Sequence, residues 1–182
     1  IDLAGVAPTA TGATTVNISG AAGFTLNAIN TGITNINGSS MGGALTVDAA
    51  QRDSDAITIT GGVNSDSIAM ENAGDVLVAG TQPIGGQDSL TVNFASIMGG
   101  LTVDLTAADQ ISIMDGSPNT AIQSGFEDVD LSSYTGAGAV VTGTATGSTI
   151  VGTASADRIT GGKSADNITG GAGGDQINAA GG

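Results

Sequence analysis

The chain has 182 residues, a length compatible with one domain or two small ones, and it contains no Cys and no His. These absences exclude a disulfide framework, a thiolate zinc site and a Ser-His-Asp triad, so we expect no enzyme activity. Seventeen acids oppose three basic residues, and the net charge is −14. Without a basic surface or a run of roughly 18 apolar residues, the chain is expected to have no nucleic-acid partner and no membrane-spanning segment.

The rest of the composition predicts an all-β structure. Glycine occurs 31 times, and Ile, Val, Ala and Thr fill the positions that large aromatic residues occupy in an ordinary core. Closely spaced glycines interrupt every helical pattern, and residues 106–109 are the only candidate for a helical turn. Fifteen of the acids are Asp, a residue that favours tight turns and binds hard cations.

Residues 1–142 contain irregular repeats. Near the start, Ile18, Ile36 and Leu45 recur at nine or twice nine residues. A longer duplication relates about 41–60 to 98–113, because Met41-Gly-Gly-Ala-Leu-Thr-Val-Asp recurs as Met98-Gly-Gly-Leu-Thr-Val-Asp. The period is broken at 51–55 and at 80–87.

A clearer pair of nine-residue units spans residues 61–78. It places Asp66 and Asp75 at the sixth position, and Ile68 and Leu77 at the eighth. Further along, the same period continues through apolar residues, which are Ile113, Ile122, Leu131 and Val140.

The period becomes regular over residues 143–182. Nine-residue units begin at Gly143, Gly152, Gly161 and Gly170. The sixth position holds Ser148 and then Asp157, Asp166 and Asp175, and the eighth position is always Ile. Each unit predicts a short strand that follows a polar turn, and one such unit cannot bury its own apolar side chains. Stacking the units buries them, so the sequence predicts a β-solenoid, or parallel β-roll, with a regular roll at 143–182.

The segment 152–178 resembles the RTX, or hemolysin-type, calcium-binding repeat G-G-x-G-x-D-x-U-x. Only 170–178 carries all three glycines, since Ser155, Ser164 and Thr153 replace others. The resemblance implies a six-residue loop followed by a three-residue strand, with residues eighteen apart stacked on one edge. It also implies that Ca²⁺ lies between stacked loops. Asp157 and Asp175 would then share one ion.

By the same reasoning, Asp166 would pair with a repeat beyond Gly182, since its upstream neighbour is Ser148. Asp66 and Asp75 complete the set of expected calcium ligands. A simpler interpretation is that Asp only forms turns, and it is at least as good for the remaining upstream positions, which are Asp48, Asp55, Asp88, Asp104, Asp109 and Asp115.

The resemblance also carries expectations about function. Calcium binding would be coupled to folding. The chain begins at Ile1 without Met, so we interpret it as a piece of a longer protein. That protein would be secreted by a Gram-negative bacterium through type I secretion. The Thr/Ala/Gly-rich composition is similar to RTX surface-layer proteins, which predicts a structural protein that self-associates at the cell surface. The alternatives are the secretion and folding tail of an exported enzyme or toxin, and an adhesin. Sugar-binding adhesins usually present exposed aromatics, and the single Tyr of this chain, Tyr134, counts against that alternative.

Overall fold

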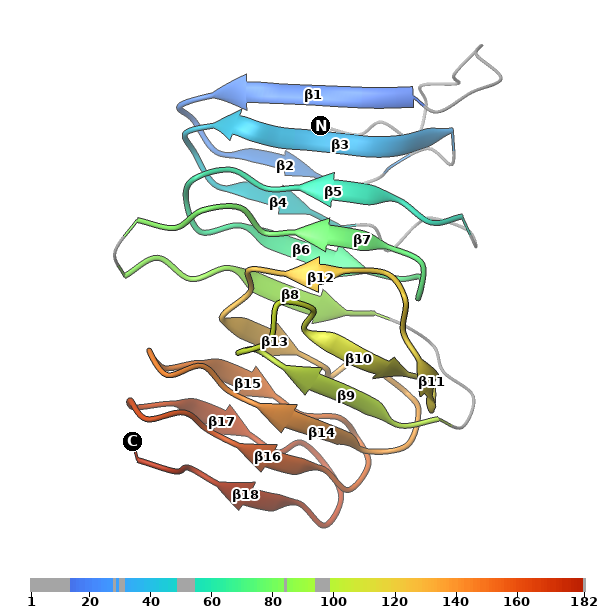
Figure 1. The fold of residues 1–182 in the computed structure, drawn as a ribbon, viewed down its shortest axis with the longest axis vertical. Coiled ribbons are helices and arrows are strands. Elements are labelled where there is room, and N and C mark those ends of the chain that lie inside the picture. The colour runs from blue at the N-terminus through green and yellow to red at the C-terminus, as the bar shows by residue number, and fades with distance from the viewer. Residues whose placement is uncertain are drawn as a thin grey trace.

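The computed structural model describes residues 14–27, 29, 32–48, 55–83, 85–93 and 99–181. Over these residues the chain forms eighteen β-strands and no helix, and it winds into a solenoid of about seven turns (Figure 1). The prediction of an all-β solenoid is therefore confirmed. The strands are β1 Thr14–Gly20, β2 Phe24–Leu26, β3 Ile33–Met41, β4 Leu45–Val47, β5 Thr58–Thr60, β6 Ser67–Met70, β7 Val76–Val78, β8 Ser89–Val92, β9 Leu101–Asp104, β10 Ile111–Met114, β11 Ser117–Pro118, β12 Gln123–Ser124, β13 Asp128–Asp130, β14 Ala139–Thr142, β15 Thr149–Val151, β16 Arg158–Thr160, β17 Asn167–Thr169 and β18 Gln176–Asn178.

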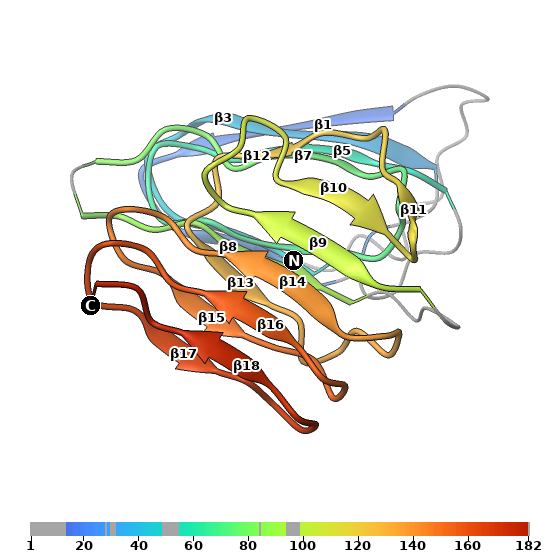
Figure 2. The same ribbon diagram turned by 60° about the horizontal axis from the view of Figure 1, so that its bottom comes forward.

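The solenoid has two walls. One wall is a single parallel sheet of seven strands, in the order β17-β15-β13-β8-β6-β4-β2. The opposite wall consists of two sheets, β1-β3-β5-β7-β12 and β11-β10-β9-β14-β16-β18. Viewed toward the C-terminal end, the walls face each other and β17 and β18 are their last strands (Figure 2).

The core between the walls is built from stacked aliphatic side chains. In the seven-stranded wall, the register aligns Val47, Ile68, Leu90, Val129 and Ile150 one above the other, and each is at most 1 % exposed. Burying one such side chain contributes about 1.5–3 kcal/mol. Since no single coil can enclose its own apolar side chain, stability depends on coil-to-coil contact.

The last four strands follow the predicted plan. They occupy the final three positions of each nine-residue unit, and their partners lie eighteen residues apart, as for Ile150 with Ile168 and Ile159 with Ile177. In the unit with all three glycines, Gly171 and Gly173 have φ values of 95° and 113°, which L side chains rarely adopt. Ser155, at the position equivalent to Gly173, does not have a positive φ, so its loop has a different backbone.

The periodic assignment of core residues between 113 and 140 is wrong at two places. Ile122 is 50 % exposed and Val140 is 41 % exposed, whereas their neighbours Gln123 and Val141 point inward. Strand side chains alternate between the two faces, so a change of one residue in loop length moves the apolar residue to the outside. The alternation within β14 decides the matter, because it buries both Ala139 and Val141.

An antiparallel hairpin interrupts the parallel roll. β9 and β10 pair antiparallel, and β11 pairs with β10. The second sheet of the opposite wall begins with these three strands. Gln110 joins this hairpin to the following coil: its Nε2 donates to the carbonyls of Leu105 (2.9 Å) and Phe126 (2.7 Å), and its Oε1 accepts from the amide of Phe126 (3.0 Å). The predicted helical turn at 106–109 is a non-helical turn within this insertion.

The two copies of the predicted duplication occupy different walls. Leu45 to Val47 form β4 in the seven-stranded wall, whereas Leu101 to Asp104 form β9 in the opposite wall. Met98, which begins the second copy, lies outside the described residues. The break at 51–55 also lies largely outside them, and the break at 80–87 is a loop that projects from one edge between β7 and β8 (Figure 1).

Candidate metal-binding edges

The residues at the start of each strand, either its first residue or the one directly before it, form rows along the edges of the solenoid. Because the strands are parallel and in register, these residues stack coil upon coil. Two rows contain more than one acid. The long row borders the seven-stranded wall and consists of Leu45, Asp66, Asp88, Glu127, Ser148 and Asp166. The short row borders the opposite wall and consists of Leu101, Ala139, Asp157 and Asp175.

Asp157 and Asp175 lie in adjacent coils of the short row, as predicted. The amide of Asp157 donates to Oδ1 of Asp175 at 3.0 Å, and the amide of Ala139 donates to Oδ1 of Asp157 at 2.6 Å. Asp157 also accepts from the amide (2.7 Å) and the hydroxyl (2.8 Å) of Thr153 in its own loop, and it is 3 % exposed. Both carboxylates thus bind the coil before them, and Asp157 also holds its own loop.

Asp166 makes the same two contacts in the long row. Its Oδ1 accepts from the amide of Ser148 at 2.8 Å, and its Oδ2 accepts from the amide of Gly162 at 2.7 Å. Its neighbour in the preceding coil is Ser148, as the repeat predicts, and no acid stacks there.

The structure does not bring Asp66 and Asp75 together. Asp66 precedes β6 in the seven-stranded wall, whereas Asp75 precedes β7 in the opposite wall. Asp66 accepts from the amides of Leu45 and Gly62, both at 2.6 Å. Asp75 accepts from the amide of Ile57 at 3.0 Å. The side chain of Ile57 is apolar, so it adds no ligand beside Asp75.

Two acids of the long row were not identified from the sequence as ligands. Oδ1 of Asp88 accepts from the amide of Asp66 at 2.6 Å, and the amide of Asp88 donates to Oε2 of Glu127 at 2.8 Å. Asp66, Asp88 and Glu127 therefore occupy three successive coils. A signal was present: Asp88 follows two glycines and precedes Leu90 by two residues, but its loop breaks the nine-residue period.

Burial changes the acid-base properties of this part of the long row. It raises the pKa of Asp88, which has no exposed surface, to about 6, and the charges of Asp66 and Glu127 act in the same direction. Burial also raises the pKa values of Asp66, Glu127 and Asp128. Hydrogen bonds from backbone amides lower these pKa values, but the effect of burial is larger. Holding these carboxylates ionised is thus unfavourable without a compensating positive charge.

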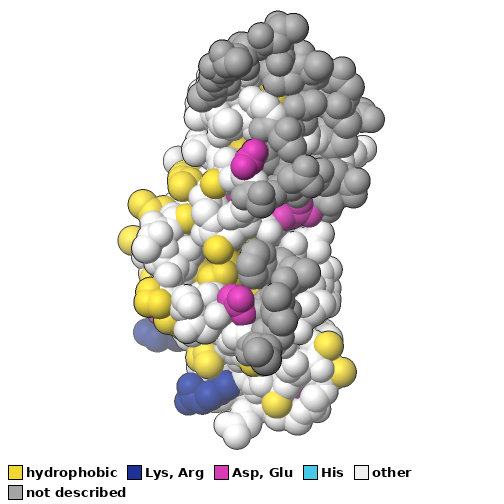
Figure 3. Space-filling model, turned by 90° about the vertical axis from the view of Figure 1, so that its right-hand side faces the viewer, with side chains coloured by type: hydrophobic (Ala, Val, Ile, Leu, Met, Phe, Trp, Pro, Cys, Tyr) yellow, Lys and Arg dark blue, Asp and Glu magenta, His cyan; other side chains and the backbone are white. Residues whose placement is uncertain are grey.

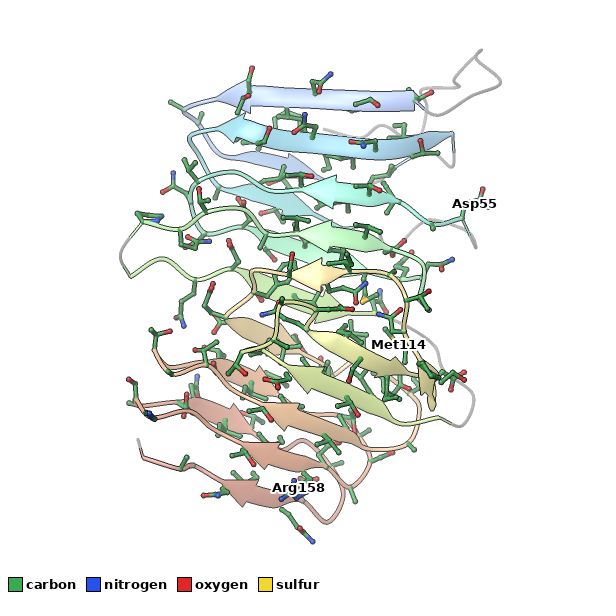
Figure 4. All side chains as sticks on the ribbon, viewed as in Figure 1. Asp55, Met114 and Arg158 are labelled. Atoms are coloured by element: carbon green, nitrogen blue, oxygen red, sulfur yellow. The ribbon has the colours of Figure 1, made fainter. Side chains whose placement is uncertain are left out.

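Other Asp residues have the turn roles that the simpler interpretation predicts. Asp104 accepts from the amide and hydroxyl of Thr106, and Asp115 has a φ of 51° and accepts from the amide of Gly99. Asp55 and Arg158, labelled in Figure 4, lie on different parts of the solenoid. Figure 3 shows a few acidic side chains at the surface of one edge among the described residues. Asp157 is buried.

The rows offer a cation few carboxylates at any one position, but carboxylate oxygens are suitable ligands. Within the described residues, no three acidic side chains form a cluster that could hold a metal ion. A carboxylate has about four lone-pair sites, so an Asp that accepts two amide hydrogen bonds still has capacity for a cation. A bound ion would take its further oxygens from loop carbonyls and water, as calcium commonly does.

Tyr134 does not provide an exposed aromatic for sugar binding. Its side chain is 1 % exposed, and its hydroxyl donates to the carbonyl of Gly99 at 2.8 Å. Over the described ranges, no helix is long and apolar enough to cross a membrane. Comparisons with protein-family models, with curated proteins and with solved structures found no match for this chain.

Proposed function

We propose that this chain is a calcium-stabilised structural solenoid of a bacterial cell surface, which folds on binding Ca²⁺ after secretion and then self-associates. The single observation that supports this proposal best is the stacking of Asp157 on Asp175 at the eighteen-residue register. Two carboxylates from adjacent loops, in a repeat that resembles a calcium-binding one, provide the anionic part of a shared site.

The electrostatics of the edges support a role for a cation. A chain with seventeen acids and three basic residues cannot neutralise its rows internally. Buried carboxylates such as Asp66 and Asp88 have raised pKa values, which means that the fold is penalised when they ionise. Calcium at these edges would offset that penalty, and extracellular calcium modules have dissociation constants on the order of 10⁻⁴–10⁻³ M. A chain with such sites would fold outside the cell and not in the cytosol.

The last described coil of the solenoid leaves one face uncovered. β17 and β18 are the last strands of their sheets, and Ile177, which stacks on buried Ile159, is 49 % exposed. An end coil with unpaired strand edges and an uncovered apolar side chain is suited to a further coil or to another molecule. The same end fits the alternative function, a secretion and folding tail that remains monomeric.

The test is a calcium titration followed by circular dichroism and light scattering, with magnesium as the control cation and EGTA to reverse binding. We expect calcium near millimolar concentration to produce β-structure, magnesium to fail, and particle size to increase once the chain has folded. Folding without particle growth would favour the secretion tail. Full β-structure in EGTA, unchanged by calcium, would refute the calcium proposal and leave Asp as a turn residue only.

A further inference from the structure

A pair of oxygen atoms, one in the 80–87 loop and one on the residue that follows it, is unexplained. Oε1 of Gln82 and Oδ2 of Asp88 are both buried, and neither has a hydrogen-bond partner among the described residues. Asp88 as a whole has no exposed surface. Buried acceptors are almost always satisfied, so two orphaned oxygens on neighbouring groups point to a missing positive partner.

The two side chains lie next to each other. The Gln82 amide lowers the pKa of Asp88, which places the two side chains within reach of each other. Its Nε2 donates to the carbonyl of Asn64 at 3.3 Å, which directs Nε2 away and leaves Oε1 unpaired. Rotating the amide by 180° would give Asp88 a donor, but it would place Oε1 against the Asn64 carbonyl oxygen, so one unsatisfied contact would replace another.

The surroundings of Asp88 are anionic. Asp66 lies beside it in the preceding coil and donates its amide to Oδ1, while Glu127 lies beside it in the following coil and accepts its amide. Both charges raise the pKa of Asp88, as does burial. A hard divalent cation is favoured where carboxylate and amide oxygens meet in such a field.

An open groove lies close to this position. A groove of about 410 Å³ adjoins the loop and is lined in part by Gly85, Gly86, Gln87 and Glu127. Gln87 spans part of this region, because its Nε2 donates to the carbonyl of Gly147 at 2.9 Å. Neither Gln82 nor Asp88 lines the groove, but Glu127, which accepts the Asp88 amide, does. Calcium commonly takes water among its ligands, so an ion with few protein ligands would need water at this position.

We propose that Oδ2 of Asp88 and Oε1 of Gln82 bind a calcium ion outside the nine-residue repeats, and that this ion fastens the 80–87 loop to the edge of the solenoid. The site differs from the repeat sites because a loop that breaks the period contributes a neutral ligand. The inference rests on the proposed calcium function only for the identity of the ion. The geometric argument, two buried oxygens without a donor, is independent of the repeats.

The test measures calcium stoichiometry and affinity by isothermal titration calorimetry on four proteins: wild type, Gln82→Leu, Asp88→Asn and Gln82→Glu. The first two variants should each lose one ion or bind it at least about tenfold more weakly. Replacing even an outer-shell partner of a metal ion typically lowers the affinity for the ion by about tenfold or more. Gln82→Glu replaces a neutral ligand with a charged one. It should bind calcium more tightly than wild type and unfold more easily in EGTA.

Gln87→Leu is the matched control. It removes a hydrogen bond of the same loop, the one to Gly147, but no orphaned oxygen, so it should keep the wild-type number of ions. Circular dichroism verifies that each variant folds in calcium. The repeat sites are tested separately by Asp157→Asn with Asp175→Asn, so failure of one site is distinguishable from failure of the other.

Two results would overturn the site. If Gln82→Leu and Asp88→Asn bind as many ions as wild type with equal affinity, no cation lies between these residues. If calcium leaves the pH dependence of stability unchanged while Asp88→Asn abolishes it, a proton shared by Asp88 and Gln82 satisfies the two oxygens instead of a metal.

Discussion

The main-chain amide of Asp157 donates a hydrogen bond to Oδ1 of Asp175, eighteen residues further along the chain, at 3.0 Å. The same contact recurs between the Ser148 amide and Asp166 at 2.8 Å. A sixth-position Asp therefore does two things: it caps its own loop and ties that loop to the preceding coil. Asn preserves an oxygen acceptor for these contacts while removing the charge, which allows the structural and cation-binding roles to be separated.

Asp175→Asn is expected to change the response to calcium much more than the fold. For every stability measurement in EGTA, an osmolyte such as TMAO holds the calcium-free chain folded. Under these conditions the melting temperature of the variant should equal or exceed that of wild type, because the Asp157 amide keeps an acceptor and one repelling charge is removed. Added calcium should raise the melting temperature of wild type but not that of the variant. Asp130→Asn is the control, since Asp130 lies in register with Thr91 and Val151, not with an acid. Equal calcium responses in all three proteins would exclude a site at Asp175.

Stability in EGTA is expected to fall as the pH rises from about 4 to about 7. Burial raises the pKa of Asp88 from 3.8 to about 6, so between these values the folded state binds the proton more tightly than the unfolded state does. The stabilisation is full below the unfolded pKa and is lost as the pH passes the folded pKa. At about 1.4 kcal/mol per pKa unit, it amounts to at most about 3 kcal/mol.

Urea titrations at a series of pH values measure this effect. Asp88→Asn should remove most of the pH dependence, and calcium should reduce it in wild type. Raised pKa values at Asp66, Glu127 and Asp128 act in the same direction, so a shallow residual slope is expected in the variant. A stability that increases with pH over this range would contradict the raised pKa values.

Thr153→Gly is expected to weaken the calcium-free fold and to favour calcium binding at Asp157. Thr153 replaces the second glycine of its repeat, and its hydroxyl occupies Oδ1 of Asp157 at 2.8 Å. Losing that hydrogen bond should cost about 1 kcal/mol in EGTA. It also frees a carboxylate lone pair for the ion. Thr153→Ser retains the hydroxyl and should behave like wild type in both measurements, which calorimetry and thermal unfolding can check.

Val140→Ala and Val141→Ala form a matched pair that tests the register of the core. Val141 is 1 % exposed and stacks on Val103 and Ile159, whereas Val140 is 41 % exposed. The buried truncation should cost about 2 kcal/mol because it leaves a cavity. The exposed one should change the free energy of unfolding by less than about 0.5 kcal/mol. Urea titrations in saturating calcium measure both free energies of unfolding. If Val140→Ala cost more than Val141→Ala, the register predicted from the nine-residue period would be correct.

Much of this fold followed from local sequence alone. Gly at the start, Asp at the sixth position and Ile at the eighth predicted a loop and a three-residue strand, and residues 149–151 and 158–160 form strands there. The stacking of Ile150 on Ile168 also followed, because two nine-residue units make one coil. These properties depend on backbone preferences and on the alternation of side chains, which each repeat carries within itself.

Outside the regular repeats at 143–182, tertiary structure alone determined which acids meet across coils. Asp88 and Glu127 are 39 residues apart because the β9–β12 segment intervenes, yet their coils are adjacent and the Asp88 amide bonds to Glu127. Likewise, Gln123 and not Ile122 lies in register with Leu77. Stacking depends on the spacing between coils and not on the number of residues in a loop. An insertion therefore hides a contact from any periodic pattern while leaving it intact in space.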